Sequence, residues 1–252
     1  MHAASALGEI GSILAVDALL SAFDDQYVKS VAIGALGNIG SERAVEPLLE
    51  ILHNDSELES TTIEALGKIG SERALDPLIE KLKYLKQGYI KQAQDVVGAL
   101  VNIGSERAVN PIIKALKGKD AMTRESLISA LGELGSNKAV DILIEALNDE
   151  DENVRRSASD SLGKIGGKQA VEALIPALIN DKSEVKWQTA EALKKIGTLE
   201  TLETLIRNPQ VNMYNRHIFS LAEVLSVRFS KEKSELIPLY RCVIKKFKPQ
   251  SP

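Results

Sequence analysis

The sequence predicts an all-α protein: an α-solenoid of about seven two-helix repeats, followed by a divergent helical cap. A phrase recurs along the chain, since ALGNIGSERAVEPLLEIL at 35–52 returns with few changes as ALGKIGSERALDPLIEKL at 65–82. A repeat of about this length is typical of arrays in which each unit packs on its neighbours. Aromatic residues are only 4% of the 252 residues. The core must therefore consist of Ala, Leu, Ile and Val, which favours closely packed helices.

The last glycine of the phrase, which we call the anchor glycine, marks each repeat. A helical apolar stripe precedes it, as in 149–166, where Val154, Ala158 and Leu162 share one helix face. Asp151 is a candidate cap at the start of this helix. We expect each anchor glycine to end its helix in the left-handed conformation. The anchor glycines recur at intervals of 29 to 34 residues, at Gly11, Gly40, Gly70, Gly104, Gly135, Gly166 and Gly197.

A shorter helix follows each anchor glycine. Serines lie at its predicted N-cap, namely Ser41, Ser71, Ser105 and Ser136. Prolines share one register further along, at Pro47, Pro77 and Pro111. Because proline lacks a backbone donor, we expect a bent or 3₁₀ first turn and a main helix that begins near the proline. Pro176 falls in mid-helix, where the sequence predicts a kink.

A further glycine lies three residues before most anchor glycines. A glycine inside a helix costs about 1 kcal/mol relative to alanine. The interpretation we favour is a close approach of the neighbouring helix, and the alternative is that these glycines only loosen the last helical turn. The residues are Gly8, Gly37, Gly67, Gly132 and Gly163.

The pattern divides the chain into a repeat array over 1–205, whose first repeat is incomplete, and a divergent helical capping region over 206–252. A terminal unit has to cover the last open edge of the core, so divergence is expected there. Within the array, 83–94 adds about three residues, which we expect to lengthen a loop around Gly88. The chain opens inside a predicted helix, which suggests a piece of a longer protein.

The phrase and its copies over 1–205 resemble the short HEAT-like repeat of the phycobilisome (PBS) lyase type. This resemblance implies a right-handed superhelix whose second helices line a concave face. Similar repeats occur in E/F-type bilin lyases, in phycobilisome-degradation factors and in arrays attached to NACHT-type NTPases. The resemblance is therefore specific for the fold and leaves several functions open.

Repetition separates core positions from variable ones. Counting back from the anchor glycine, positions 1, 4, 5, 8 and 12 are apolar or small in nearly every repeat, whereas positions 2, 6, 9, 10 and 13 vary. The variable positions share the helix face opposite the core. We predict that a protein partner binds this face through Tyr27, Asn38, Glu64, Lys68, Asp95, Met122, Glu125, Glu133, Asn153, Arg156, Asp160, Trp187, Gln188 and Glu191.

Two features of this face suggest how it would bind. An exposed Trp187 beside Arg156 would anchor an interface; the alternative is a tryptophan packed against the adjacent helix. A run of acidic residues would attract a basic segment; the alternative is an ordinary solvated helix face. The acidic residues are Glu64, Asp95, Glu125, Asp160 and Glu191.

Basic residues share a register on the first helices of the repeats, the shorter ones that follow the anchor glycines, at Arg43, Arg73 and Arg107, and Lys138 continues it. We favour a structural ladder with acidic residues of neighbouring repeats. A strip that binds an acidic ligand is the weaker alternative.

No catalytic constellation is recognisable in the sequence. His2, His53 and His217 are not followed by glutamate, so the His-Glu pairs of HEAT-type iron hydroxylases are missing, and HExxH, CxxC, P-loop and GxSxG motifs are missing too. The single cysteine, Cys242, lies in an apolar pattern and is interpreted as a buried side chain. The sequence therefore predicts no enzyme activity, no cofactor and no metal site.

The composition limits the classes of partner that we expect. A net charge of −4 and a pI near 5.6 make a nucleic acid an unlikely partner, because phosphate binding needs a basic face. No apolar stretch approaches the ~20 residues of a membrane span, and no signal peptide is recognisable, so we expect a cytoplasmic protein.

The sequence predicts a non-catalytic protein-interaction scaffold that binds a partner on the concave face and belongs to a larger protein. The alternative, implied by the family resemblance, is an accessory subunit of a bilin lyase or phycobilisome-handling system, with a bilin-carrying protein as its partner.

Overall fold

The computed structural model describes residues 2–84, 90–180, 185–198 and 201. Over these residues the regular secondary structure is helical and contains no strand, which confirms the predicted all-α class. The chain divides into two compact units, Met1–Leu134 and Gly135–Pro252, and each is described by itself. The predicted capping region over 206–252 and the loop around Gly88 lie outside the described residues.

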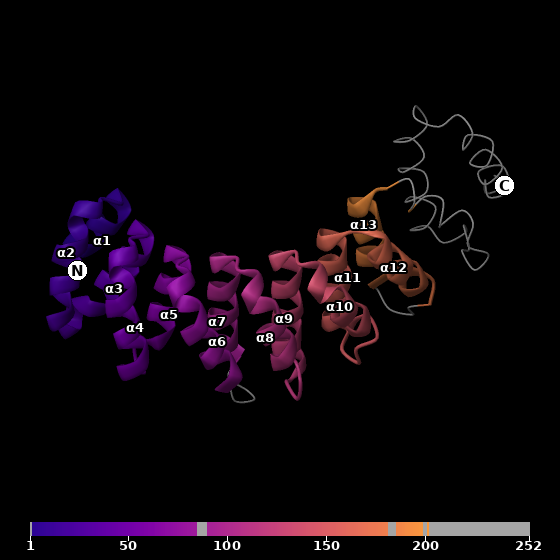
Figure 1. Cartoon of the computed structure of the whole chain (residues 1–252), viewed down its shortest axis with the longest axis horizontal. Helices are drawn as coiled ribbons and strands as arrows, with labels where there is room; N and C mark the ends of the chain where they lie inside the picture. Colours follow the sequence, from indigo (N-terminus) through magenta and orange to yellow (C-terminus); the bar gives the residue numbers. More distant parts are fainter. Residues whose placement is uncertain (1, 85–89, 181–184, 199–200, 202–252) are drawn as a thin grey trace, which may run out of the picture. The chain divides into compact units, whose positions relative to one another are not determined.

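The first unit consists of two layers of helices, visible in Figure 1. The longer helices α1, α3, α5, α7 and α9 pack consecutively, and the shorter helices α2, α4, α6 and α8 pack against them from one side. The bounds are α1 (His2–Ile10), α2 (Val16–Ser21), α3 (Gln26–Ile39), α4 (Val45–Asn54), α5 (Glu59–Ile69), α6 (Leu75–Tyr84), α7 (Ile90–Ile103), α8 (Val109–Ala115) and α9 (Ala121–Leu134).

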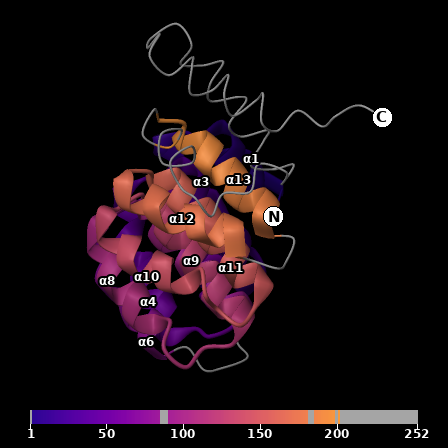
Figure 2. The ribbon, with the colours of Figure 1, turned by 90° about the vertical axis from the view of Figure 1, so that its right-hand side faces the viewer.

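The second unit continues the same alternation. The helices that end at anchor glycines, α11 and α13, pack on each other as the longer helices of the first unit do, α10 packs on α11, and α12 packs on both α11 and α13. Figure 2 shows α12 and α13 side by side. The bounds are α10 (Val140–Ala146), α11 (Glu152–Ile165), α12 (Lys168–Asn180) and α13 (Val185–Ile196).

A short 3₁₀ helix precedes most of the shorter α-helices, as the proline register predicts. In the second repeat the 3₁₀ turn covers Glu42–Ala44, the α-helix begins at Val45, and Pro47 is its third residue, where a backbone donor would have no partner within the helix. The other 3₁₀ helices are η1 (Ile13–Ala15), η2 (Ala22–Asp24), η4 (Glu72–Ala74), η5 (Glu106–Ala108) and η6 (Asn137–Ala139). Helix α12 continues through Pro176, and the kink there stays a prediction.

The predicted caps are present at most repeats. The Ser41, Ser71 and Ser136 hydroxyls each accept a hydrogen bond from the backbone N–H two residues later, whereas Ser105 makes no such bond. Asp151 caps α11 by accepting from the backbone N–H of Asn153 at 2.8 Å.

The anchor glycines end the longer helices with positive φ angles. Gly70 is typical, with φ 72° and ψ 20° in the left-handed region. Gly166 differs from the prediction, because its ψ of −157° places it outside that region. A second glycine with positive φ, Gly167, follows it, so the chain leaves α11 by a different path.

The glycine three residues before the anchor glycine allows the longer helices to approach each other closely. A Cβ atom built on Gly37 would lie 2.7 Å from the Cα of Ala65, closer than such atoms approach in real proteins. The equivalent pairs are Gly8 with Ala35, Gly67 with Ala99 and Gly163 with Ala192, at 2.7 to 2.8 Å. The interpretation of these glycines as close-approach positions is confirmed at these four helix pairs.

The core also holds buried hydroxyls. In the second unit, Thr189 donates to the Val185 carbonyl at 3.0 Å and shares a 3.1 Å hydrogen bond with Ser159. Thr62 occupies the same register in α5, eight residues before its anchor glycine, and is fully buried. The Thr62 hydroxyl has no hydrogen-bond partner.

Replacing Gly37 by alanine is expected to destabilise the first unit by about 1–3 kcal/mol, because the new methyl group forces α3 and α5 apart. The control is Gly34→Ala in the same helix, where a Cβ meets nothing within 4 Å. That variant should be neutral or more stable by up to about 1 kcal/mol, from the higher helix propensity of alanine. Urea denaturation followed by circular dichroism measures both, and equal effects would contradict the close-approach interpretation.

Replacing Thr62 by valine is expected to stabilise the protein by about 1 kcal/mol, because a buried hydroxyl without a partner is removed at nearly constant volume. Thr189→Val is the matched control and should lose about 1 kcal/mol, because the hydroxyl there is hydrogen-bonded. The same denaturation experiment compares them, and a destabilised Thr62→Val variant would show that the hydroxyl is satisfied in solution.

Candidate partner-binding face

The candidate residues lie on the longer helices of the two units, and each is exposed or half-buried. In the first unit, Tyr27 and Asn38 belong to α3, Glu64 and Lys68 to α5, Asp95 to α7, and Met122, Glu125 and Glu133 to α9. In the second unit, Asn153, Arg156 and Asp160 belong to α11, and Trp187, Gln188 and Glu191 to α13. We call these last six residues the α11–α13 face. Binding of a partner to these residues stays a prediction.

Large apolar side chains stand out on both units. Tyr27 and Met122 are exposed on the first, and Trp187 is 55% exposed on the second. Trp187 and Arg156 occupy the same register, ten residues before their anchor glycines, on two helices that pack on each other. Since more than half of the tryptophan surface stays open, packing within the chain leaves room for a partner to cover it.

In the first unit, two acidic residues of the face, Glu64 and Asp95, are bound to neighbouring polar groups. The Glu64 carboxylate pairs with Lys68 at 2.8 Å, and Lys68 also donates to the side-chain carbonyl of Asn38 at 3.2 Å. Asp95 accepts from the Ser60 hydroxyl at 2.5 Å and from Lys91 at 2.7 Å. The hydrogen bond to Asp95 raises the pKa of Lys91 above its ordinary value.

The acidic residues of the α11–α13 face are paired as well. Asp160 accepts from Lys195 of the next repeat at 2.5 Å and pairs with Lys164 at 3.0 Å, and Glu191 pairs with Lys194 at 3.3 Å. Partial burial alone would raise the pKa of Asp160, but the hydrogen bonds and charges of both lysines outweigh it and hold that pKa below its ordinary value. The arrangement therefore favours the self-paired, solvated face over a bare acidic strip.

The predicted arginine ladder is present in the first unit and is structural. Arg43 pairs with Asp17 of the preceding repeat at 2.5 Å, and Arg73 pairs with Glu46 in the same way. Arg107 donates to both Asp76 oxygens, at 2.9 and 3.1 Å. Because these pairs are exposed, each contributes roughly 0–1 kcal/mol.

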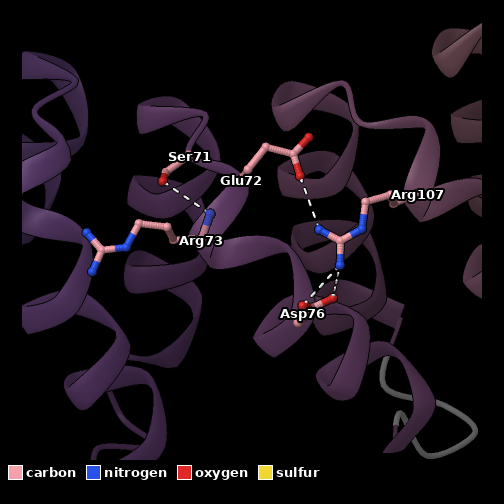
Figure 3. A network of polar contacts seen from close by, with 5 residues as sticks. All are labelled: Ser71, Glu72, Arg73, Asp76 and Arg107. Carbon is pink, nitrogen blue, oxygen red and sulfur yellow. Dashed lines mark hydrogen bonds and ion pairs between the residues drawn. The ribbon is translucent and has the colours of Figure 1, made fainter.

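Figure 3 shows that the repeated Ser-Glu-Arg letters link one repeat to the next. Arg107 lies between Glu72 and Asp76, and Arg73 points the other way. The Ser71 hydroxyl accepts from its own 3₁₀ turn and donates to Glu42 of the preceding repeat at 2.8 Å. Sequence reasoning missed this serine–glutamate link, although the constant spacing of the two letters was a signal for it.

The comparisons with known proteins agree with this architecture. A family profile for HEAT repeats matches residues 16–95, 82–159 and 141–212, which is more than half of the chain. The chain belongs to the HEAT-repeat family. A profile for the PBS lyase HEAT-like repeat matches residues 1–25. No curated protein sequence matches this HEAT-repeat protein significantly.

Several solved structures are similar to the HEAT-repeat chain. An engineered protein is 21% identical with a TM-score of 0.50, over 90% of this chain and 74% of that one. The complex of CpcE and CpcF of phycocyanin lyase from Nostoc sp. PCC7120 is 24% identical with a TM-score of 0.45, over 89% and 88%. Human deoxyhypusine hydroxylase in complex with glycerol is 23% identical with a TM-score of 0.39, over 92% and 90%. At these identities, likeness to the engineered protein bears on the fold alone.

The part of the HEAT-repeat chain that the structure describes contains no group of three or more His, Cys, Asp or Glu side chains placed to hold a metal ion. None of the described helices combines the length and apolar character needed to cross a membrane. The histidine and the cysteine predicted to have no catalytic role at 217 and 242 lie outside the described residues.

The first HEAT repeat also carries exposed apolar side chains that the sequence did not predict. Ile10, Ile13 and Leu14 are exposed there. The signal was a change of letters, because GSERA of the second and third repeats reads GSILA at 11–15.

Replacing Asp160 by asparagine is expected to lower stability at pH 7 by roughly 0.2–1 kcal/mol, a range that allows for solvent screening of these partly exposed ion pairs. Because the pKa of Asp160 is lowered in the folded state, its stabilisation is fully present above the ordinary aspartate pKa and is lost as the pH falls through the folded value. The difference in unfolding free energy between wild type and variant should therefore shrink at acid pH and at high salt. A pH-independent difference would contradict the ion-pair explanation.

Proposed function

We propose that this HEAT-repeat protein is a non-catalytic scaffold that binds a protein partner on the exposed face of its longer helices. The observation that supports the proposal is that each repeat uses different residues for its contacts with other repeats and for its exposed face. Contacts between repeats use constant letters, such as the glycine–alanine pairs and the Ser-Glu-Arg links. The exposed positions of the same helices change from repeat to repeat, so they are free to carry specificity.

The α11–α13 face is the part of this surface best suited to anchor a partner. It combines an exposed tryptophan with a half-buried arginine at one register, the residue types that dominate binding energy in interfaces. Arg156 is oriented by Glu152 at 3.1 Å, so its guanidinium is partly preorganised. Around this pair, Asp160 and Glu191 alternate with lysines, which favours a partner with mixed charges over a purely basic segment.

The electrostatics of the face also favour binding over catalysis. A carboxyl group that serves as a general acid needs a raised pKa. The pKa of Asp160 is lowered, because two lysines stabilise its ionised form. A carboxylate that is ionised and paired at neutral pH is suited to recognition and orientation more than to proton donation.

A second candidate function is that of an accessory subunit in a system that handles bilin-carrying proteins. The match of residues 1–25 to the PBS lyase HEAT-like repeat favours it. Both candidates require a protein partner, and the identity of the captured partner distinguishes them.

Replacing Trp187 and Arg156 together by alanine is expected to abolish partner capture, with an affinity loss of about tenfold or more for each anchor residue. Affinity capture with mass spectrometry would compare wild type, the double variant and Tyr84→Ala. Tyr84 is the control because it is an exposed aromatic residue on α6, a helix of the other layer.

Proteins that the wild type and Tyr84→Ala capture and the double variant loses support the proposal. A bilin-carrying protein among them would favour the second candidate. Equal capture by all three chains would contradict a role for the α11–α13 face.

A further inference from the structure

The helices that end at anchor glycines differ in charge between the two units. In the first unit, α1, α3, α5, α7 and α9 together carry four basic and six acidic residues. In the second unit, α11 and α13 carry six basic residues and three acidic ones. The whole chain has a net charge of −4. The α11–α13 face therefore lies on helices whose charge is opposite in sign to that of the chain.

Part of this basic charge surrounds one carboxylate. Asp160 accepts a hydrogen bond from Lys195 of α13 at 2.5 Å and pairs with Lys164 of its own helix at 3.0 Å. Glu191 pairs with a different lysine, Lys194, at 3.3 Å. Two ammonium groups therefore share a single carboxylate. Partial burial opposes the ionisation of Asp160, but both lysines outweigh it and hold its pKa below the ordinary value, so the local potential is positive.

The same registers are balanced in the first unit. Lys68 lies two residues before its anchor glycine, as Lys164 and Lys195 do. It pairs with Glu64 of its own helix, and its contact on the neighbouring helix is the neutral side-chain carbonyl of Asn38. Lysines near a helix C-terminus also complement the helix dipole. That role is open to every repeat, and it does not explain why two lysines of different repeats converge on one carboxylate.

The two lysines lie on the same exposed face as the tryptophan. The side chains of Lys164 and Lys195 are 36% and 52% exposed although both are paired. An ammonium group has three donors, so each lysine has donors left for a second acceptor. Lys195 follows Trp187 by eight residues on α13, which is about 12 Å along the helix. An extended chain spans that distance with about four residues.

We propose that the partner of the α11–α13 face binds it through an acidic segment, with one carboxylate between Lys164 and Lys195 and an apolar side chain over Trp187. This inference rests on the proposed function, because it names the chemistry of the partner for that face. The partner carboxylate completes a ring of alternating charges with Lys164, Asp160 and Lys195. Each lysine then donates one more charge-assisted hydrogen bond, and the surplus of positive charge is balanced.

The charge distribution favours a short acidic segment over a nucleic acid. A nucleic acid carries a charge at every nucleotide and needs a continuous basic face. The basic surplus here is confined to α11 and α13, and the chain as a whole is negative. A segment with a few carboxylates matches the two lysines and leaves the acidic first unit uncontacted.

The experiment uses Trp187 as its own reporter, because it is the single tryptophan of the chain. Short peptides without tryptophan are titrated against the full chain, and tryptophan fluorescence is measured. Each peptide carries a leucine and, about four residues further along, a pair of glutamates, glutamines or lysines. The glutamate peptide should bind about fivefold or more tightly than the glutamine peptide, and its advantage should shrink at high salt.

Two variants separate anion binding from a structural role of the Lys195–Asp160 pair. Lys195→Gln and Asp160→Asn both break this pair, so a purely structural role predicts the same direction of change in peptide affinity. Binding of a carboxylate predicts opposite directions. Lys195→Gln should weaken binding of the glutamate peptide about threefold or more, whereas Asp160→Asn, which removes the competing carboxylate, should strengthen it.

Lys83→Gln is the control, because it removes the same charge from an exposed position of α6, in the other layer, and should leave the affinity unchanged. Circular dichroism verifies that each variant is folded. A glutamate peptide that leaves the fluorescence unchanged, or binds no more tightly than the glutamine peptide, overturns the inference. A shift of both variants in one direction overturns it too, and so does a thymidine oligonucleotide that binds more tightly than the glutamate peptide.

These outcomes are distinct from a failure of the proposed function. The scaffold role is contradicted when replacement of Trp187 and Arg156 leaves the captured partners unchanged. If partners are lost on that replacement but the glutamate peptide shows no preference, the face binds a partner and the acidic segment is wrong.

Discussion

Consecutive longer helices meet where a glycine of one repeat contacts an alanine of the next, and the rest of each unit depends on this approach. With the Cα of Ala65 only 2.7 Å from where a Cβ of Gly37 would lie, the two backbones pack without an intervening side chain. Leu36 and Leu66, each of which lies between the alanine and the glycine of its own helix, are fully buried. The glycine costs helix propensity, and close packing of the helices offsets that cost. This contact sets the distance between consecutive longer helices, and therefore the spacing of the side chains on their exposed face.

Ion pairs and hydrogen bonds reinforce the stacking of the repeats, and they also neutralise much of the surface charge within the chain. The Ser-Glu-Arg letters direct their hydrogen bonds towards neighbouring repeats, as Arg107 does with Glu72 and Asp76. On the opposite layer, lysines bind the carboxylates of the longer helices. Charge that is balanced within the chain contributes little net attraction to a partner and more to the choice among partners. This is why the proposed scaffold role is centred on Trp187 and Arg156 and not on the acidic run.

The sequence by itself determined the helical repeat, its anchor glycines, the serine caps and the 3₁₀ turns before Pro47 and Pro77, because each follows from local backbone chemistry repeated at a regular interval. It also indicated the close approach at Gly37, although not its partner Ala65. Tertiary structure decided the rest. Whether Asp160 is a bare carboxylate depends on Lys195, which lies 35 residues away and reaches it only across α11 and α13. Likewise, the letters show Leu14 and Thr62 as apolar and small polar residues, but exposure of the first and burial of the second without a hydrogen-bond partner are set by which neighbours pack against them.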